Sequence, residues 1–317
     1  MSNPIPLVRL DPPIAPHWVG DVLGAEARDG EETEKEGVVL HTRHAVDTDG
    51  GDLLFLRIDV PRAAGLDDDA FRSAVARAYL TLAETLQGHD LRPLRIWNYV
   101  PAIRRPSGSG FSRYEVFNEG RKDGYVQWYG EADRSGRVVS SGVGHRGEDL
   151  VLHVLACGRE ALPIENPRQR PAYRYSARYG PAAPCFSRAA RLDGGLPGLC
   201  EGQSVGLVAG TASIVGEDSR HAGDLDAQVT ETCLNLATVG ARVAGSAAPQ
   251  TPGDDASREV LARYRELRVY LAREADVDRI ESAIQGWLPG LTRLDVALAD
   301  LCRPELLVEA EGILHCD

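Results

Sequence analysis

The sequence predicts an α+β fold in which mixed β-sheets carry helices packed on one face. The chain has 317 residues, more than the roughly 100–200 residues of a usual domain. The order strand, helix, strand, helix, strand, strand can be followed twice along it, with apolar residues at strand or helix spacing. The two halves share this pattern without residue-level identity, so we predict two modules of similar design.

The first copy of the pattern follows an arm, residues 1–35, whose Pro, Asp and Glu content predicts irregular structure. The clearest element is a helix over 67–86, because Asp67 or Asp68 can cap it and apolar residues recur at helical spacing. The whole copy comprises helices at 67–86 and 114–129 and strands at 53–60, 94–100, 138–144 and 150–157. We assign it to an N-terminal module, residues 36–160.

The second copy follows a Pro- and Arg-rich stretch, residues 162–184, which has no clear period. Its longest predicted element is a helix over 224–242, with apolar residues on one side. The copy comprises helices at 224–242 and 277–287, a short helix or turn at 258–265, and strands at 205–215, 267–271, 296–301 and 306–314. We assign it to a C-terminal catalytic module, residues 161–317.

The composition argues against several classes of protein. Lys and Arg number 35 against 47 Asp and Glu, a formal charge of −12, whereas a general nucleic-acid binder needs a basic face. No segment approaches the roughly 20 apolar residues of a spanning helix, and the N-terminus does not resemble a secretory signal. The six cysteines form no CxxC pair, which is typical of reduced thiols. We therefore expect a cytoplasmic protein that binds neither nucleic acid nor membrane.

Standard catalytic motifs are missing from the sequence. It contains no P-loop and no HExxH. Its GxGxxG match at 142–147 is followed by a predicted strand, and its GxSxG match at 202–206 runs into one, whereas both motifs require a strand that turns into a helix. The eight histidines are scattered, which favours surface or structural roles over metal ligation. We therefore expect neither a nucleotide cofactor nor a catalytic metal.

One stretch, residues 171–188, is unusually rich in arginine and tyrosine. It contains Arg174, Arg178, Arg188, Tyr173, Tyr175 and Tyr179. Arginine binds carboxylates bidentately, and tyrosine adds a ring face and a hydroxyl. The cluster indicates a pocket for a small organic anion. The alternative is a surface loop whose arginines pair with the protein's own Asp and Glu, and composition favours neither.

The last predicted strand carries two glutamates among apolar residues. Alternation gives two faces, the first with Leu306, Val308 and Ala310 and the second with Leu307, Glu309 and Glu311. A carboxyl that faces a cleft has its pKa raised by desolvation, which suits a general acid. The alternative is an ordinary carboxylate on a solvent-facing strand. Cys302, just upstream, is either a catalytic thiol or part of the core.

Taken together, five segments resemble the chorismatase family. They are RIWNYVPAI (95–103), RYEVFNEGR (113–121), YRYSARYGPAAPCFSRA (173–189), GTASIVGEDSRHAGD (210–224) and DLCRPELLVEAEG (300–312). The C-terminal half is also similar to the RidA/YjgF fold, a small α+β subunit that normally forms trimers. Chorismatases are similar to two such modules in one chain. The resemblance therefore implies RidA/YjgF-like modules at 36–160 and 161–317. It also implies a monomer in which the two modules of one chain are arranged like two subunits of an oligomer.

The resemblance implies an enzyme of bacterial secondary metabolism, such as antibiotic biosynthesis, that cleaves chorismate and releases pyruvate from its enolpyruvyl ether without a cofactor. Glu309 matches the family's catalytic glutamate, whose expected task is to protonate the enol ether. The residues expected to contact the substrate's carboxylates and ring are Arg121, Tyr175, Arg178 and Arg188, with Thr211 and Ser213 as pocket hydroxyls.

Two branches of the family differ in their ring product. One hydrolyses chorismate to a dihydroxycyclohexadiene carboxylate, and the other forms 3-hydroxybenzoate. Cys302 and Gly216 match the 3-hydroxybenzoate branch, so we predict 3-hydroxybenzoate and pyruvate as products. Arg104 and Arg105 depart from the asparagine that the family has after VPAI. A RidA-like deaminase or ligand-binding protein is the hypothesis from another class.

Overall fold

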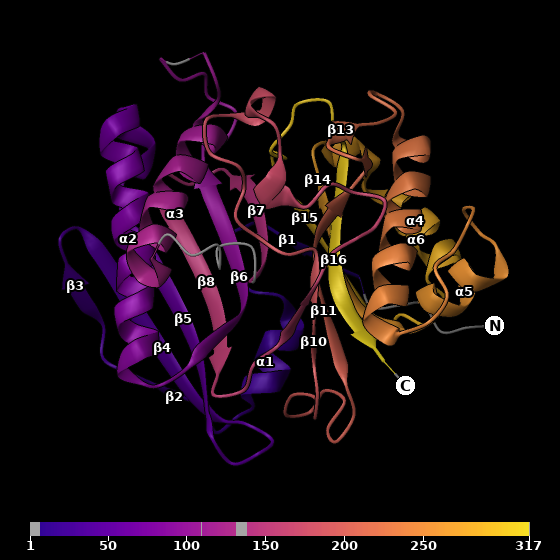
Figure 1. The fold of residues 1–317 in the computed structure, drawn as a ribbon, viewed down its shortest axis with the longest axis horizontal. Coiled ribbons are helices and arrows are strands. Elements are labelled where there is room, and N and C mark those ends of the chain that lie inside the picture. Colours follow the sequence, from indigo (N-terminus) through magenta and orange to yellow (C-terminus); the bar gives the residue numbers. More distant parts are fainter. Residues whose placement is uncertain (1–6, 109, 131–137, 317) are drawn as a thin grey trace.

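Two seven-stranded sheets lie side by side in the computed structural model, which describes residues 7–108, 110–130 and 138–316 (Figure 1). Helices cover the side of each sheet that faces away from the other sheet. Apolar side chains from both sheets form one cluster between them. The layers therefore run helix, sheet, sheet, helix, and the inner faces of the sheets meet along the middle of the molecule.

The first sheet is formed by the N-terminal half. Its spatial order is β2 (Arg28–Asp29), β4 (Val38–Val46), β5 (Asp52–Val60), β8 (Leu150–Cys157), β6 (Arg92–Pro101), β7 (Val139–His145), with β3 (Thr33–Lys35) paired to β4. Its outer face is covered by α2 (Asp68–Gly88), which follows η1 (Ala63–Gly65), and by α3 (Arg113–Tyr129). Strands β6 and β7 are parallel and the other named pairs antiparallel. Both helices begin at side-chain caps, which satisfy backbone N–H groups that the first turn leaves free.

The second sheet combines the C-terminal half with the first strand of the chain. Its order is β1 (Leu7–Leu10), β15 (Arg293–Leu298), β14 (Tyr264–Leu271), β16 (Val308–His315), β11 (Val205–Ala212), β10 (Ala189–Leu192), β9 (Leu162–Ile164). Its outer face packs against α4 (Leu225–Ala244), α5 (Asp255–Leu261) and α6 (Val277–Trp287). Short elements complete this half: η2 (Ala172–Arg174), η3 (Ala177–Tyr179), η4 (Glu274–Asp276) and a hairpin of β12 (Ile214–Val215) and β13 (Asp218–Ser219). Strand β16 is central in this sheet, between β14 and β11, so its side chains are buried on both faces.

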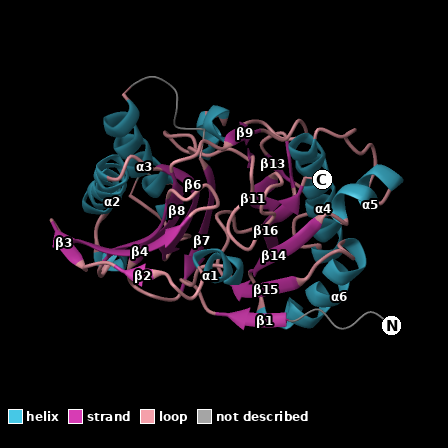
Figure 2. Cartoon of the chain, turned by 90° about the horizontal axis from the view of Figure 1, so that it is seen from below, coloured by secondary structure: helices cyan, strands magenta, loops and turns pink. Residues whose placement is uncertain are grey.

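The N-terminal arm is ordered where the structure describes it, so the prediction of irregular structure over 1–35 is wrong there. Residues 1–6 of that prediction lie outside the described residues. Strand β1 extends the second sheet by pairing in parallel with β15. Helix α1 (His17–Leu23) lies between the two sheets (Figure 2) and buries Trp18, Val19, Val22 and Leu23. The arm is held in place by the backbone pairing of β1 and by the apolar face of α1. Neither feature can be recognised from the Pro- and acid-rich composition of the arm.

The predicted α+β class, with mixed sheets and helices on one face, is confirmed. Two details of the predicted elements are wrong. The strand expected over 205–215 is divided, because β11 ends at Ala212 and the chain then enters the β12–β13 hairpin. Beyond the arm, strands β4, β9, β10 and β13 were not predicted. The division into modules at 36–160 and 161–317 stays a prediction. None of the described helices is long and apolar enough to cross a membrane.

Candidate active site

A cleft lies between the two halves of the chain and is lined by side chains from both. It is lined by Tyr114, Glu115, Arg121, Ser140, Ser141, Gly142, Tyr175, Tyr179, Pro184, Phe186, Arg188, Gly210, Ala212, Ile214, Cys302, Arg303 and Glu309. Helix α3 and strand β7 supply one side. The segment 175–188, strands β11, β12 and β16, and the loop before β16 supply the other. The structure thus brings together five of the predicted site residues: Arg121, Tyr175, Arg188, Cys302 and Glu309.

Glu309 is the buried carboxyl group of this cleft. It is the second residue of β16 and is 6% exposed. Gly210 of β11 lies directly against it, since a Cβ atom at Gly210 would overlap Glu309 Oε1. Burial raises the pKa of Glu309 to about 8; the Glu311 carboxylate adds to the rise, while Arg95 and Arg188 oppose it. The carboxyl group therefore carries its proton at neutral pH, as a general acid must.

The alternation predicted for the last strand is correct only from Val308 onward. Glu309, Glu311 and Ile313 share the inner face, whereas Val308, Ala310 and Leu314 pack in the core beneath the outer helices. Leu306 and Leu307 precede the strand, and their predicted faces are wrong. Leu306 packs between the sheets and Leu307 lies in the core beneath the helices, because strand alternation does not apply in the turn before β16.

Arg121 approaches the cleft from α3 and is almost completely buried, at 1% exposed. Its Nη2 donates to Asn118 Oδ1 over 2.7 Å, and its guanidinium lies 5.2 Å from the centre of the Phe117 ring. Its Nε has no hydrogen-bond partner among the described residues. Arg121 is therefore held in place by neutral groups, and one of its donors is unsatisfied.

Arg188 enters from the segment that precedes β10 and is 3% exposed. Its Nη2 donates to the hydroxyl of Tyr175 over 2.7 Å and to the carbonyl oxygen of Arg170 over 3.2 Å. Its Nε, too, lacks a partner among the residues that the structure describes. Tyr175 and Arg188, which the sequence placed in one cluster, are thus in direct contact at the cleft.

Arg303 is a cleft arginine that we did not predict. Its Nη1 donates to the carbonyl oxygen of Glu217 (2.8 Å) and to Ser219 Oγ (3.0 Å), and its guanidinium lies 3.9 Å from the centre of the Tyr179 ring. The sequence offered a signal, because Arg303 follows Cys302 within the DLCRPELLVEAEG segment. Tyr114, in RYEVFNEGR, was equally visible, whereas nothing in the sequence marked Ser141.

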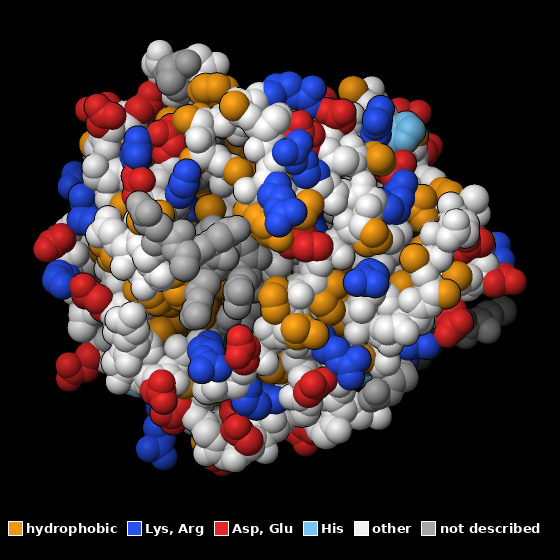
Figure 3. Space-filling view, in the orientation of Figure 1, with side chains coloured by type: hydrophobic (Ala, Val, Ile, Leu, Met, Phe, Trp, Pro, Cys, Tyr) orange, Lys and Arg blue, Asp and Glu red, His pale blue; other side chains and the backbone are white. Residues whose placement is uncertain are grey.

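The three cleft arginines, Arg121, Arg188 and Arg303, share one electrostatic property. None has a carboxylate within 4.0 Å among the described residues, although other arginines of the chain are paired with acidic groups. A buried charge is costly unless it is paired, so three such cations along one cleft indicate a site for an anion. Outside, Lys and Arg are interspersed with Asp and Glu on the face shown in Figure 3.

Arg178 and Gly216 do not line the cleft, contrary to expectation. The Arg178 guanidinium is exposed and pairs with the Asp218 carboxylate and the Tyr179 hydroxyl. Gly216 has a φ of 63° in the β12–β13 hairpin, a backbone conformation that glycine adopts readily. Arg178 therefore has an internal acidic partner, and Gly216 has a backbone role.

Thr211 and Ser213 also lie outside the cleft lining. The Thr211 hydroxyl donates to the carbonyl oxygen of Ala209 over 2.9 Å, and the Ser213 hydroxyl to that of Arg220 over 3.0 Å. The cleft is lined instead by Gly210, Ala212 and Ile214. The pairing of β11 with β16 shifts register between Val208 and Thr211, and such an irregularity changes which residues face inward.

Cys302 lines the cleft close to Glu309. Burial raises the pKa of its thiol to about 12, and the Glu309 charge adds to the rise. At neutral pH the group is a thiol, whereas a cysteine nucleophile acts as the thiolate. The site therefore favours a packing or hydrogen-bonding role for Cys302 over attack on a ligand. Among the described residues, His, Cys, Asp and Glu form no cluster that could hold a metal ion.

Comparisons with known proteins agree with the segments singled out in the sequence. A family model described as "Chorismatase FkbO/Hyg5-like, N-terminal" matches residues 32–156. A 3-hydroxybenzoate synthase of Streptomyces hygroscopicus is 31% identical over 306 residues, which cover 95% of this chain and 82% of that protein.

Solved structures also match parts of the chain. The crystal structure of a chorismatase matches with a TM-score of 0.69 and 26% identity, over 90% of this chain and 80% of that one. RidA from an Antarctic Psychrobacter matches 50% of this chain and 99% of its own, at 14% identity and a TM-score of 0.32.

The protonated state of Glu309 has a consequence for stability. Its pKa is about 8 in the folded protein, against an ordinary value of 4.5 that holds on unfolding. A carboxyl with a raised folded pKa destabilises the folded state progressively as the pH rises from about 4.5 to 8. Glu309→Gln removes the ionisation, so we expect its free energy of unfolding to exceed that of wild type by about 1–3 kcal/mol at pH 8.5 and to approach it at pH 5.

Chemical denaturation at the two pH values measures this difference, with Glu274→Gln on the exposed η4 as the control. Equal pH dependence of the wild type and Glu309→Gln would show that Glu309 ionises normally.

Proposed function

The chain belongs to the chorismatase family, and from this premise we propose that it converts chorismate into pyruvate and 3-hydroxybenzoate in the cleft described above. One observation carries the proposal: a proton-bearing carboxyl, Glu309, lines the same cleft as three buried arginines that lack carboxylate partners among the described residues. Such a site fits a dianionic substrate that needs a proton. The name of the Streptomyces relative supports 3-hydroxybenzoate as the ring product.

Chorismate carries two carboxylates, one on the ring and one on the enolpyruvyl side chain. The cleft offers Arg121 from the N-terminal half and Arg188 and Arg303 from the C-terminal half. Arginines on both sides of a cleft can hold both ends of a dianion and fix its orientation. The rings of Tyr114, Tyr175 and Phe186 give the cleft apolar surface on which the substrate ring can pack.

Glu309 supplies the proton in this proposal. An enol ether is a weak base at carbon, so the acid must be positioned at the methylene carbon in a site that excludes water. A new C–H bond forms there, the bond between the ring and the ether oxygen breaks, and its electron pair leaves with pyruvate. Glu309 becomes a carboxylate beside Arg95 and Arg188, whose charges stabilise it.

The proton balance closes within the same cleft. Pyruvate and 3-hydroxybenzoate together contain the atoms of chorismate, so this branch consumes no water. In chorismate the ether oxygen and the ring hydroxyl are on neighbouring carbons, so 3-hydroxybenzoate forms only if the hydroxyl oxygen bonds to the carbon that the ether oxygen leaves and its bond to the original carbon then breaks. The hydroxyl proton passes to the Glu309 carboxylate, which returns to its starting state. The hydrogen on the newly oxygenated carbon leaves as a proton when the ring becomes aromatic, and the phenol oxygen takes up one proton. Cys302, present as a thiol, contributes to the shape of the cleft near that ring.

The proposed enzyme is cytoplasmic and acts as a monomer.

Replacing Glu309 with glutamine tests the acid. The variant keeps the side-chain shape but has no proton to deliver, so we expect kcat to fall roughly 100- to 10,000-fold with KM changed little. Pyruvate release is followed by a coupled assay, and the ring product is identified by chromatography. Wild-type turnover in the variant contradicts the role of Glu309, and a dihydroxycyclohexadiene carboxylate as the sole wild-type product contradicts the proposed branch.

Replacing Arg303 with methionine tests the anion site. Losing a charge-assisted contact to a carboxylate costs about 1.5–3 kcal/mol, so we expect kcat/KM to fall roughly 10- to 100-fold, mainly through KM. Arg258→Gln on α5 is the matched control, because Arg258 is exposed and pairs only with the exposed Asp255 among the described residues. Equal kcat/KM in both variants would exclude Arg303 from substrate binding.

A further inference from the structure

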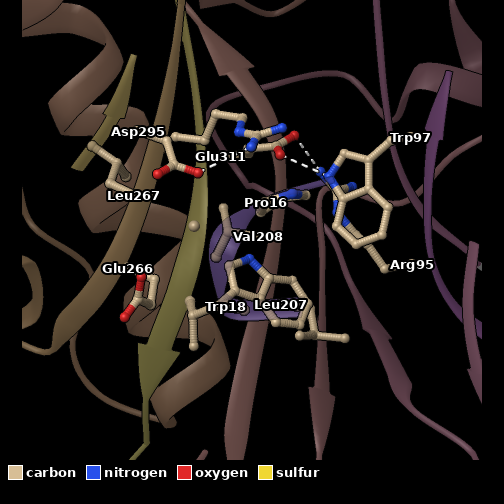
Figure 4. Close-up of a pocket in the computed structure, with 13 residues that line it drawn as sticks. Pro16, Trp18, Arg95, Trp97, Leu207, Val208, Glu266, Leu267, Asp295 and Glu311 are labelled. Carbon is tan, nitrogen blue, oxygen red and sulfur yellow. Dashed lines mark hydrogen bonds and ion pairs between the residues drawn. The ribbon is translucent and has the colours of Figure 1, made fainter. Parts of the chain in front are cut away.

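A second buried glutamate, Glu311, lies two residues after Glu309 on the same face of β16. It is 3% exposed and does not line the cleft. Instead it faces a smaller hollow between the sheets, shown in Figure 4, whose walls include Trp18, Trp97 and Leu207. Its position between the sheets gives it no part in substrate contact.

The Glu311 carboxylate is surrounded by hydrogen-bond donors from three strands. Arg95 Nη2 of β6 lies 2.6 Å from Oε2, Trp97 Nε1 of β6 donates to Oε1 over 2.7 Å, and the Tyr270 hydroxyl of β14 donates to Oε1 over 3.2 Å. The Ser141 hydroxyl of β7 also donates to Oε2. Figure 4 shows Arg95 and Trp97 converging on this carboxylate. Both carboxylate oxygens of Glu311 are therefore hydrogen-bonded, which fixes the position of the group.

A short chain of contacts connects Glu311 with Glu309. The Ser141 hydroxyl that donates to Glu311 accepts a hydrogen bond from the Gly210 N–H over 2.9 Å. Gly210, in turn, lies against Glu309 Oε1. Two residues apart on one face of a strand, the two glutamates are separated by about 6–7 Å along the backbone. Glu311 can therefore act on Glu309 both through its charge and through this contact chain.

The charges around Glu309 act in opposite directions. The Glu311 carboxylate favours the protonated form of Glu309, and Arg95 of β6 and Arg188 before β10 favour the ionised form. Other titratable or charged groups that line the two hollows or act on these glutamates come from α3 (Tyr114, Glu115, Arg121), β6 (Tyr99), the segment before β10 (Tyr175, Tyr179), β14 (Glu266, Arg268, Tyr270), β15 (Asp295) and the loop before β16 (Cys302, Arg303). The carboxylate nearest to Glu309 along its own strand is thus the one that opposes the arginines.

We propose that Glu311 is a positioning residue for the reaction: its fixed carboxylate keeps the proton on Glu309 and, through Ser141 and Gly210, holds that carboxyl in the cleft. The inference rests on the proposed function, because the proton matters only if Glu309 delivers it. Burial of Glu309 raises its pKa, and Glu311 is the second contributor to the rise. Without the Glu311 charge, burial alone would oppose Arg95 and Arg188, which lower the pKa of Glu309.

The pH profile of Glu311→Gln separates this role from a structural one. The glutamine oxygen can replace one carboxylate oxygen and accept from Arg95 or from Trp97, but the negative charge is gone. The kcat for pyruvate release declines at high pH, and we call this decline the alkaline limb of the pH profile. In Glu311→Gln we expect the alkaline limb to shift to a lower pH by about one unit or more, with activity recovering at lower pH. A limb that stays at the wild-type pH, whatever happens to kcat itself, overturns the proposal.

Three further variants control the interpretation. Glu311→Asp restores the charge and should return the limb toward the wild-type pH. Trp97→Phe removes one donor but no charge and should not move the limb down; a downward shift equal to that of Glu311→Gln contradicts the charge effect. Glu311→Asn is a second neutral variant with the same expected shift, and if neither neutral variant folds, Glu311 is structural and the proposal fails.

The wild type distinguishes this inference from the proposed function. If the wild-type protein releases no pyruvate from chorismate, the proposed function fails. If the wild type is active and Glu311→Gln leaves its alkaline limb unmoved, only the role of Glu311 fails.

Discussion

The burial of two carboxyl groups on one face of β16 is the constraint on which the rest of the site depends. Both lie between two apolar sheet faces, where an ionised group is costly unless it is paired. Glu311 accepts hydrogen bonds from an arginine, an indole and two hydroxyls. Glu309 lies beside the Gly210 backbone and an open cleft, and burial there raises its pKa to about 8. Two identical side chains on one strand face thus have very different surroundings.

The same cost of burying an unpaired charge applies to the positive charges of the cleft arginines. A chain with a formal charge of −12 has many acidic groups for its arginines to pair with, and Arg178 illustrates this by pairing with Asp218. Arg121, Arg188 and Arg303 are instead held by amide, hydroxyl, carbonyl and aromatic groups. Their positive charges therefore remain available to a ligand. A dianion can bind at these charges although the net negative charge of the whole protein repels it.

The sequence predicted the chemistry of the site better than its geometry. A strand period singled out Glu309 and a local residue cluster singled out Arg188, whereas Arg121 came from the resemblance to the chorismatase family; the structure places all three in the cleft. Thr211 and Ser213 were misplaced because a shift of register in β11 is a tertiary feature with no residue signature. Arg303 was missed because its place in the cleft depends on how the loop before β16 meets the β12–β13 hairpin. The ordered arm was missed because β1 is fixed by backbone pairing with β15 at the far end of the chain.

The central claim, that Glu309 holds a proton at neutral pH, can be measured directly by NMR. Titration of protein labelled with ¹³C at the glutamate carboxyl carbon, compared with Glu309→Gln, identifies the Glu309 resonance as the one that the variant lacks. We expect this resonance to titrate near pH 8. A midpoint near the ordinary glutamate value of 4.5 would contradict the claim, because Glu309 would then be ionised at neutral pH and could not act as the acid.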